Sequence, residues 1–307
     1  MTKENIGFIG VGLMGHGMAK NIVEKGYPLT ILCHKNRAPV DDLVKRGGKE
    51  VHSAKEVAEK SDVVFLCVTG AAEVEPVVRG VDGIAAGAKK GLIIVDTSTS
   101  EPTLTRALAE ELSSRGVFFC DAPLARTPKE AEEGKLGVMM GGDAGTFERV
   151  KPILACFSDT INHVGPVGAG HAMKLINNFL AMGYGAIYAE ALSLGRKAGI
   201  EPKTFDKVIR GGRMDCGFYQ TFMGYVLEGN RDSHKFSLKN AHKDMRYVAN
   251  LGNASGVVNV LAAAIKNSYA AAEGMGYGAD NVPLLVDAVA QLNGLPPLHT
   301  ARRSVAE

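Results

Sequence analysis

A lysine and an asparagine lie one helical turn apart in the most apolar helix that the sequence predicts. Lys174 and Asn178 belong to the stretch Gly165–Arg196, and their four-residue spacing places them on one face. An ammonium in apolar surroundings can serve as a general acid/base, because desolvation brings a lysine pKa toward the working pH. The alternative is a structural lysine that snorkels from the helix end into water. This stretch alone leaves both interpretations open, so the elements around it must decide.

A glycine-rich loop near the N-terminus has the pattern G-x-G-x-x-G, between an expected strand at Ile6–Ile9 and an expected helix at His16–Lys25. In this context the first glycine permits a tight turn, the second lets the backbone approach a pyrophosphate, and the third lets helix and strand pack closely. The helix N-terminus adds N–H groups and a positive dipole end. The loop therefore predicts a dinucleotide site, with an ordinary glycine turn as the alternative. Its cofactor-binding candidates are Gly10, Gly12, Leu13, Met14 and Gly15.

The end of the second expected strand, Leu29–Cys33, indicates which dinucleotide binds. An NAD site usually places a carboxylate there for the ribose hydroxyls, about 20 residues past the glycines. Here the chain continues as His34-Lys35-Asn36-Arg37, which contains two cations and no acid. A ribose 2′-phosphate would be favoured at these residues, so we expect NADP(H) as the cofactor, with NAD(H) as the alternative. The competing interpretation is that Lys35 and Arg37 are only solvated loop charges.

Strands alternate with helices through the first half of the chain. After the first two strands we expect strands at 62–68, 92–96, 117–121, 136–140 and 161–164, and helices at 39–45, 54–60, 74–78, 102–115 and 128–133. This alternation predicts an α/β fold with a doubly wound parallel sheet, in which ligands bind at the carboxyl ends of the strands. That edge gathers the glycine loop, the further cofactor candidates Val68, Thr69 and Thr99, and the segment Asp121–Thr127.

From Gly168 onward the strand pattern stops and helical periods dominate. We expect a long connecting helix at about 168–197, followed by helices at 202–209, 217–228, 239–251, 258–275 and 282–292. The chain therefore divides into a dinucleotide-binding domain, residues 1–164, and an all-helical domain for substrate binding and oligomerisation, residues 165–307.

Two polar residues, Arg126 and Thr127, follow the strand that ends at Asp121. The planar guanidinium of an arginine can bind a carboxylate, sulfonate or phosphate through two parallel hydrogen bonds. At the mouth of the predicted crevice, Arg126 is either a contact for a substrate anion or an ordinary surface arginine.

Composition and charge argue against several classes of protein. The 307 residues are 46% apolar and 22% charged, with a net charge of +2 and no basic run that would suit nucleic acid or an anionic membrane. Trp is absent, and the apolar run 179–189 is too short to span a bilayer. Neither a metal-binding spacing nor a G-x-S-x-G nucleophile motif occurs. The five cysteines form no CxxC pair, and the first strand begins at Ile6 with no signal peptide before it, so we expect a cytoplasmic protein.

Five motifs, in the expected order, resemble those of the β-hydroxyacid dehydrogenase family. The family includes 3-hydroxyisobutyrate dehydrogenase, tartronate semialdehyde reductase and the succinic and glyoxylate semialdehyde reductases. The motifs are GFIGVGLMGHGMAKNI at Gly7–Ile22, VDTSTSEP at Val95–Pro102, DAP at Asp121–Pro123, GAGHAMKLINN at Gly168–Asn178 and HKD at His242–Asp244. The resemblance covers nearly the whole chain and is much more specific than a single glycine loop.

The resemblance implies a Rossmann domain, a long interdomain helix, an all-α domain, and assembly into a homodimer or homotetramer. It implies that Lys174 is the catalytic general acid/base and that Asn178 helps to hold the substrate. Thr99 and Lys243 would line the nicotinamide and substrate end of the site, and Phe236 would pack there. Lys243 is therefore a candidate for both substrate and cofactor binding, and Phe236 for cofactor binding.

One departure from the family pattern concerns the substrate. The family usually continues DAP as Val-Ser-Gly-Gly, whose serine and glycine amides bind the substrate carboxylate, whereas this chain has Leu124-Ala125-Arg126-Thr127. An Arg-Thr pair at this place is similar to the sulfolactaldehyde reductase branch, where it serves a sulfonate. We therefore expect Ala125, Arg126 and Thr127 to bind either a carboxylate that is held differently or a larger or more strongly charged anion.

Together the residues and the resemblance predict reversible hydride transfer between NADP(H), or NAD(H), and a short β-hydroxy acid or semialdehyde. Lys174 would exchange the proton at the carbonyl oxygen. One alternative is an imine reductase-like enzyme of the same architecture, a class that generally lacks this lysine. The other is a non-catalytic dinucleotide-binding regulatory protein, which the presence of Lys174 and Asn178 disfavours. The expected partners are a small anionic substrate and further copies of the chain, not nucleic acid or a membrane.

Overall fold

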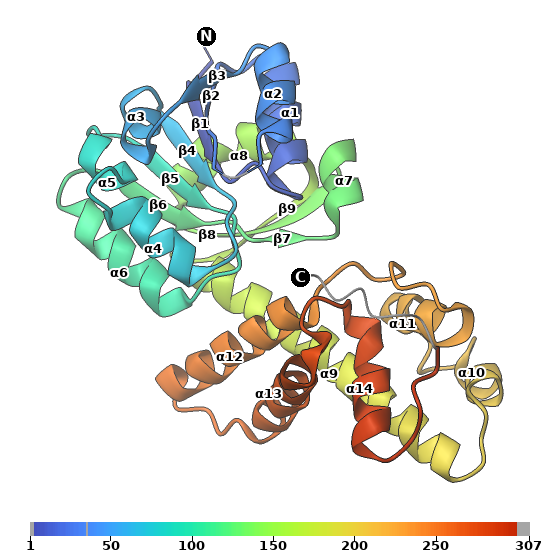
Figure 1. Ribbon diagram of the computed structural model, residues 1–307. Helices are drawn as coiled ribbons and strands as arrows, with labels where there is room; N and C mark the ends of the chain where they lie inside the picture. Colours follow the sequence, from blue (N-terminus) through green and yellow to red (C-terminus); the bar gives the residue numbers. More distant parts are fainter. Residues whose placement is uncertain (1–2, 35, 300–307) are drawn as a thin grey trace. The chain divides into compact units, whose positions relative to one another are not determined.

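The computed structural model describes residues 3–34 and 36–299, and the chain divides into two compact units after Lys174 (Figure 1). The strands are β1 (Ile6–Ile9), β2 (Leu29–Leu32), β3 (Lys49–Val51), β4 (Val63–Leu66), β5 (Ile93–Asp96), β6 (Phe118–Asp121), β7 (Leu124–Ala125), β8 (Leu136–Gly141) and β9 (Ser158–Gly165). The helices of the first unit are α1 (Gly15–Glu24), α2 (Ala38–Lys45), α3 (Ala54–Glu59), α4 (Ala71–Arg79), α5 (Ile84–Gly87), α6 (Pro102–Ser113), α7 (Pro128–Glu133) and α8 (Ala144–Leu154). The helix α9 (Ala169–Lys197) begins in the first unit and continues into the second.

Six strands of the first unit form a parallel sheet in the order β3-β2-β1-β4-β5-β6. The strand order reverses between β1 and β4, so the loops after these two strands open toward a common crevice. This is the strand order of a Rossmann sheet. The predicted doubly wound α/β fold is therefore confirmed.

The central strands β1, β4 and β5 are buried on both faces, because their alternating side chains are almost all apolar. Phe8 of β1 joins a core cluster that includes Met18 of α1 and Val150 of α8. Its neighbour Ile9 joins a second cluster on the opposite face, with Leu108 of α6. The helices thus cover the sheet in two layers, and the carboxyl edge of the strands carries the loops of interest.

The far edge of the sheet departs from the parallel pattern. β8 pairs antiparallel with β6 and β7, and parallel with β9. In β7, Leu124 lies opposite Val138 and Ala125 lies opposite Gly137. The segment after Asp121, which we expected to be a loop, therefore includes a short strand.

Four observed elements are not predicted by the sequence pattern. β3 has three residues and β7 has two, too few to show an alternation. α5 has only four residues. α8 carries an internal proline, Pro152, a residue that usually ends a helix.

The long helix expected at about 168–197 is observed as α9, over Ala169–Lys197. Its last turn carries Arg196 and Lys197, where positive charge interacts favourably with the helix dipole. Within residues 3–34 and 36–299, no helix is both long enough and apolar enough to cross a membrane.

The second unit is helical, as the sequence pattern predicts. After α9 it contains α10 (Pro202–Ile209), α11 (Gly217–Glu228), α12 (Leu238–Ser255), α13 (Val260–Ala272), a π turn (Glu273–Tyr277), a 3-10 turn (Val282–Leu284) and α14 (Leu285–Leu292). Buried tyrosines join these helices through their hydroxyl groups. Tyr219 donates to Asp206 at 3.0 Å, and Tyr225 donates to Asp287. Of the single helix expected over 258–275, α13 forms Val260–Ala272, and the residues after it belong to the π turn, in which Gly276 takes a φ of +87°.

Candidate functional site

The glycine loop leaves open space at the position where a pyrophosphate would approach. Gly10 has a φ of +100°, and a Cβ there would lie 2.2 Å from the carbonyl oxygen of Cys67, so this turn requires glycine. At Gly15 a Cβ would lie 2.0 Å from the carbonyl oxygen of Gly10. At Gly12, in contrast, no described atom lies within 4 Å of the Cβ position. The three glycines therefore differ: two satisfy the fold, and Gly12 borders space that the fold does not fill.

Leu13 and Met14 complete this loop. The Leu13 side chain is 83% exposed, although it is large and apolar. Met14 is the N-cap residue of α1 and provides no side-chain hydrogen bond to the first turn. The N–H groups in the first turn of α1 have no side-chain cap, so they can donate to a phosphate of a dinucleotide, beside which the exposed Leu13 would lie. In the described part of the chain, no group of three or more His, Cys, Asp or Glu side chains is placed to hold a metal ion.

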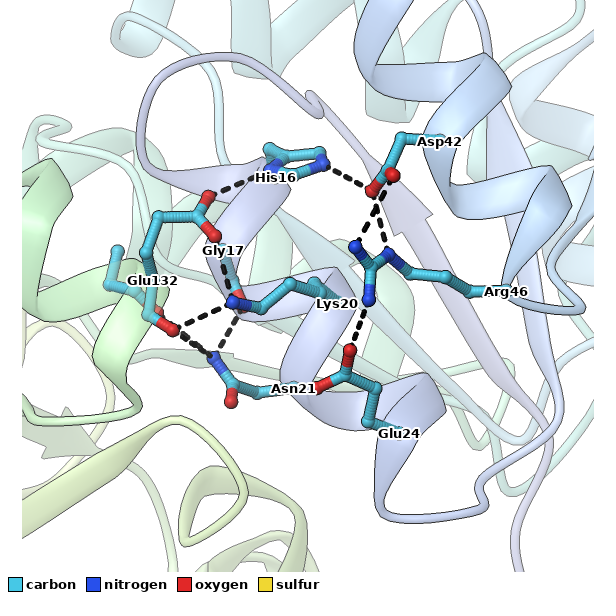
Figure 2. Close-up of polar contacts among 9 residues, drawn as sticks. His16, Gly17, Lys20, Asn21, Glu24, Asp42, Arg46 and Glu132 are labelled. Atoms are coloured by element: carbon cyan, nitrogen blue, oxygen red, sulfur yellow. Dashed lines mark hydrogen bonds and ion pairs between the residues drawn. The ribbon is translucent and has the colours of Figure 1, made fainter.

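His16, directly after the loop, connects α1 to α2 and α7 (Figure 2). Its Nδ1 lies 2.7 Å from Oε1 of Glu132, and its Nε2 lies 2.9 Å from Oδ2 of Asp42. Lys20 adds an ion pair with Glu132 at 2.9 Å. Hydrogen bonds from Arg46 and His16 lower the pKa of Asp42 to about 2. Because α7 directly follows Thr127, this network joins the dinucleotide loop to the loop expected to bind substrate.

Arg37, expected at the ribose phosphate, is engaged by two carboxylates. Its Nη1 and Nη2 donate to the two oxygens of Glu50 at 2.5 and 2.7 Å, and its Nε donates to Asp41 at 2.8 Å. The hydrogen bonds to Glu50 and Asp41 raise the pKa of Arg37, and those from Arg37 to Glu50 lower the pKa of the Glu50 carboxyl. A 2′-phosphate would therefore compete with Glu50 for this guanidinium.

The other residues expected at the ribose phosphate lie on the same connection between β2 and α2. His34 is exposed, and Asn36 is exposed with its Oδ1 accepting a hydrogen bond from the Ala38 N–H at 3.2 Å. Lys35, the remaining candidate, lies outside the described residues.

The loops after β4 and β5 bring three further candidates to the same edge as the glycine loop. The Val68 N–H donates to Oγ of Ser98 at 3.0 Å, which ties the two loops together. Thr69 is exposed and Thr99 is partly exposed on these loops. The carboxyl edge of the sheet thus collects the predicted cofactor residues of the first unit.

A buried aspartate caps the helix that carries the catalytic candidate. Asp121, at the end of β6, accepts hydrogen bonds from the N–H groups of Gly168 at 2.7 Å and His171 at 2.6 Å. Burial raises the pKa of Asp121, while these two hydrogen bonds act in the opposite direction. Gly170 permits the close approach of α9, since a Cβ there would lie 2.4 Å from the carbonyl oxygen of Met139. The first turn of α9 is therefore fixed to the ends of β6 and β8.

Lys174 lies one turn after this capped end of α9 and is partly exposed. The same continuous helix carries Asn178, which is buried. Their four-residue spacing places both side chains on one face of α9. Lys174 therefore lies on the helix whose first turn Asp121 caps at the end of β6.

In the second unit, a buried aspartate contacts two of the predicted site residues. Asn178 Nδ2 donates to Asp244 Oδ2 at 2.6 Å, and Lys243 Nζ lies 3.2 Å from Asp244 Oδ1. The Lys243 ammonium also lies 5.4 Å from the centre of the Tyr247 ring. Because Nδ2 faces Asp244, the amide oxygen of Asn178 turns away from it. Phe236, the remaining candidate of this unit, is half-buried just before α12.

Of the predicted substrate-binding residues, Ala125 ends β7, and the two polar residues after it, Arg126 and Thr127, are held in internal contacts. Arg126 has a φ of +78°, a left-handed conformation that favours glycine. Its guanidinium donates to Asp159 at 2.7 Å and to the carbonyl of Lys135. The Thr127 N–H donates to the Glu130 carboxylate at 3.0 Å, as in a capping box, and the Thr127 hydroxyl donates to the same carboxylate. A substrate anion would therefore compete with Asp159 for Arg126.

Three residues that shape this region are not among the predicted site residues. Asp121 and Asp244 lie within the DAP and HKD motifs, so a signal for them exists in the sequence. Their role as buried acceptors depends on contacts with α9, which the motifs do not reveal. His16 has no signal beyond its place after the glycine loop, because its two acidic partners come from distant segments.

Comparison with known families gives two matches that together span most of the chain. Residues 5–165 match the model described as the NAD binding domain of 6-phosphogluconate dehydrogenase. Residues 168–286 match the model described as NAD-binding of NADP-dependent 3-hydroxyisobutyrate dehydrogenase.

Individual proteins show the same similarity. The 2-(hydroxymethyl)glutarate dehydrogenase of Eubacterium barkeri is 31% identical over 298 residues, which cover 94% of this chain and 96% of that protein. The mitochondrial 3-hydroxyisobutyrate dehydrogenase of Rattus norvegicus is 33% identical over 238 residues, 76% of this chain and 70% of the relative. Among solved structures, 3-hydroxyisobutyrate dehydrogenase of Mycobacterium tuberculosis with L-serine has a TM-score of 0.81 at 26% identity, covering 92% of this chain and 98% of its own.

Proposed function

The chain belongs to the β-hydroxyacid dehydrogenase family of NAD(P)-dependent oxidoreductases, and we propose that it interconverts a short β-hydroxy acid and its semialdehyde with Lys174 as the general acid/base. The observation that carries this proposal is the placement of Lys174. It lies in the first turns of α9, whose end is capped by Asp121 at the same sheet edge as the glycine loop. An amine at that edge is well placed to exchange a proton with a substrate carbonyl.

The proton transfer follows from the chemistry of the lysine. In reduction, the Lys174 ammonium hydrogen-bonds the substrate carbonyl oxygen and delivers a proton as negative charge develops there. In oxidation, the neutral amine accepts the hydroxyl proton. The amide oxygen of Asn178 accepts a hydrogen bond from Asn177 Nδ2 at 3.4 Å and keeps a second lone pair, which is the proposed acceptor for the ammonium or for a substrate hydroxyl. Acid/base catalysis of this kind contributes about 10²–10⁴-fold to the rate.

The proposed cofactor is NADP(H), which supplies the hydride when bound. Gly12 would border the pyrophosphate, and the open space at this residue supports that assignment. His34, Lys35, Asn36 and Arg37 would hold the ribose phosphate, and Arg37 would have to give up its hydrogen bonds to Glu50. The other residues that would hold the cofactor are Gly10, Gly15, Leu13, Met14, Val68, Thr69, Thr99, Phe236 and Lys243.

The substrate anion binds at Ala125, Arg126 and Thr127, with Lys243 as a further contact. The left-handed backbone at Arg126 supports this proposal, because the loop keeps the shape of a glycine while carrying a cation. Binding requires Arg126 to exchange Asp159 for the substrate. A sulfonate or carboxylate suits the guanidinium equally in geometry, so both belong in a substrate panel.

We also propose that the helical domain, residues 165–307, assembles the protein into a homodimer or homotetramer. Large apolar side chains repeat every three to seven residues along α9 and are exposed. They are Ile176, Leu180, Tyr184, Ile187 and Leu194. An apolar stripe of this length suits a second copy of the chain. Light scattering of the wild type and of Ile187→Asp tests this, and a wild-type monomer would contradict it.

The cytoplasm is the proposed compartment. All five cysteines are free thiols, and burial raises the pKa of the Cys67 thiol to about 11 and that of Cys156 above its usual range. Five thiols without a disulfide suit a reducing compartment. Cell fractionation with an antibody to the protein checks this, and recovery outside the cytoplasm would contradict it.

A screen of nicotinamide absorbance tests the proposed function. NADPH or NADH is mixed with short semialdehydes that carry a carboxylate or a sulfonate, using the wild type and Arg126→Gly. We expect turnover of at least one semialdehyde by the wild type, faster with NADPH than with NADH. Tight NADPH binding without turnover across the panel would instead favour a regulatory protein.

A further inference from the structure

His171 is a fully buried polar side chain that the proposed reaction does not use. It lies in the first turn of α9, three residues before Lys174, and its exposed fraction is 0%. Its imidazole lies among Asp96 at the end of β5, Asp121 at the end of β6 and Thr105 of α6, all of them buried. A buried imidazole beside two carboxylates is costly unless its polar atoms are paired, so its contacts indicate its role.

Each side of the imidazole faces a different element of the first unit. Nδ1 lies 2.7 Å from Oγ1 of Thr105 and 3.9 Å from Oδ2 of Asp121. Nε2 lies 3.8 Å from Oδ2 of Asp96. The backbone N–H of the same residue donates to Asp121. Through His171 alone, the first turn of α9 therefore contacts β5, β6 and α6.

The contact with Asp96 indicates where a proton lies. Neither His171 Nε2 nor Asp96 Oδ2 has a hydrogen-bond partner among the described residues, and the two atoms lie 3.8 Å apart. Two bare lone pairs at this distance would repel each other in a place that water does not reach. A proton on Nε2 makes the contact attractive. The Thr105 hydroxyl has one proton, which it donates either to Nδ1 or to the carbonyl oxygen of Glu101 at 3.1 Å, and both arrangements are compatible with a proton on Nε2.

We propose that His171 is a positioning residue that fixes the first turn of α9 on the sheet and thereby sets the place of Lys174. This inference rests on the proposed role of Lys174 as the general acid/base. Residues three apart are neighbours on a helix surface, so a rotation or shift at His171 moves Lys174 as well. Without the imidazole, only the backbone cap by Asp121 and the packing of α9 hold this turn. Misplacement of a reacting group by about 1 Å can cost about 10²-fold in rate.

Kinetics of three variants test the positioning role. His171→Leu removes both polar contacts, His171→Gln keeps an amide N–H that can face Asp96, and Leu108→Ala removes a buried side chain from α6 without touching the polar cluster. We expect His171→Leu to lower kcat about tenfold or more, with the NADPH dissociation constant and KM changed less than about twofold. His171→Gln should recover most of that loss, and Leu108→Ala should lose stability but keep kcat.

The kinetic result can contradict the inference in two ways. A wild-type kcat in His171→Leu would overturn it. A kcat loss no larger than that of Leu108→Ala at equal thermal stability would also overturn it, because His171 would then be only a structural residue.

A spectroscopic measurement tests the same arrangement without any turnover. In the full chain labelled with ¹⁵N-histidine, we expect an Nε2–H signal that exchanges slowly with water, is absent in His171→Gln and shifts in Asp96→Asn. An unprotonated Nε2 at neutral pH would overturn the inference even if Lys174 is catalytic. Conversely, normal turnover by Lys174→Ala would overturn the proposed function and leave the Nε2 signal in place, so the two failures are distinguishable.

Discussion

A methyl group added at either of two glycines in the dinucleotide loop should separate folding from cofactor binding. Gly12 and Gly15 are three residues apart in the same motif, yet their surroundings differ. Alanine is the smallest side chain that probes this difference. We therefore expect Gly15→Ala to destabilise the fold and Gly12→Ala to weaken NADPH binding without destabilising the fold.

The magnitude at Gly15 follows from its contacts. A Cβ there would lie 2.0 Å from the Gly10 carbonyl oxygen and 3.0 Å from a ring carbon of Phe8. The nearer atom belongs to the backbone, so no side-chain rotation relieves the overlap, and either the loop or α1 must shift. Overpacking typically costs about 1–3 kcal/mol and occasionally more. We expect the free energy of unfolding to fall by at least about 2 kcal/mol.

At Gly12 the same change meets no described atom within 4 Å, and the residue does not have a left-handed φ. A glycine-to-alanine change at an unstrained position stabilises a protein by about 0.4–1 kcal/mol through the unfolded chain. The methyl group would instead overlap a bound pyrophosphate. An overlap of about 1–3 kcal/mol weakens NADPH binding about 5- to 140-fold.

Two measurements check this pair of variants. Urea unfolding followed by circular dichroism gives the free energy of unfolding. Titration calorimetry gives the NADPH dissociation constant. Wild-type affinity in Gly12→Ala, or a loss of more than about 1 kcal/mol of stability in that variant, would refute the assignment of this open space to the cofactor.

Three further substitutions probe the charged residues of the first unit. Arg46 is the main cause of the low pKa of Asp42, about 2. Asp42 therefore stabilises the fold at a pH above the ordinary carboxyl pKa of about 3.9, and this contribution is lost as the pH falls toward 2. Asp42→Asn should reduce the loss of stability between these pH values in urea unfolding, and an unchanged pH dependence would contradict the ion pair. Glu50→Gln should release Arg37 and strengthen NADPH binding relative to NADH, measured as a ratio of dissociation constants; an unchanged ratio would remove Arg37 from the phosphate site. Arg126→Gly should not lower the free energy of unfolding, because relief of a left-handed backbone, about 1–2 kcal/mol, offsets the loss of an exposed ion pair, which water and salt screen. The same variant should raise KM for an anionic substrate, and an unchanged KM would exclude Arg126 from the anion site.

Much of the fold could be predicted because its signals are local. The apolar strand at Ile6–Ile9, followed by glycines and a helix, indicates a dinucleotide fold from a short window of residues. α8 was not predicted from the sequence, although Asp143 caps its first turn, and the observed helix accommodates Pro152 in its interior. β7 was not predicted because its pairing with β8, not its own two residues, makes Leu124–Ala125 a strand.

The candidate site was predictable in outline but not in its contacts. The spacing of Lys174 and Asn178 placed both on one helix, since helical periodicity is readable from sequence. The partner of Asn178 is Asp244, which is 66 residues away, and only the folded chain brings the two together. Arg126 was expected to face a substrate, whereas its guanidinium contacts Asp159 in the structure. Contacts between distant segments therefore decide how each candidate is held.

The measurement that tests the central claim most directly is the turnover of Lys174→Ala. It is assayed with NADPH and the semialdehyde that the wild type reduces fastest, beside the NADPH dissociation constant of the same variant. Loss of the general acid/base predicts a kcat lower by about 10²–10⁴-fold, with a dissociation constant within about twofold of the wild type. A kcat close to that of the wild type would contradict the assignment of Lys174.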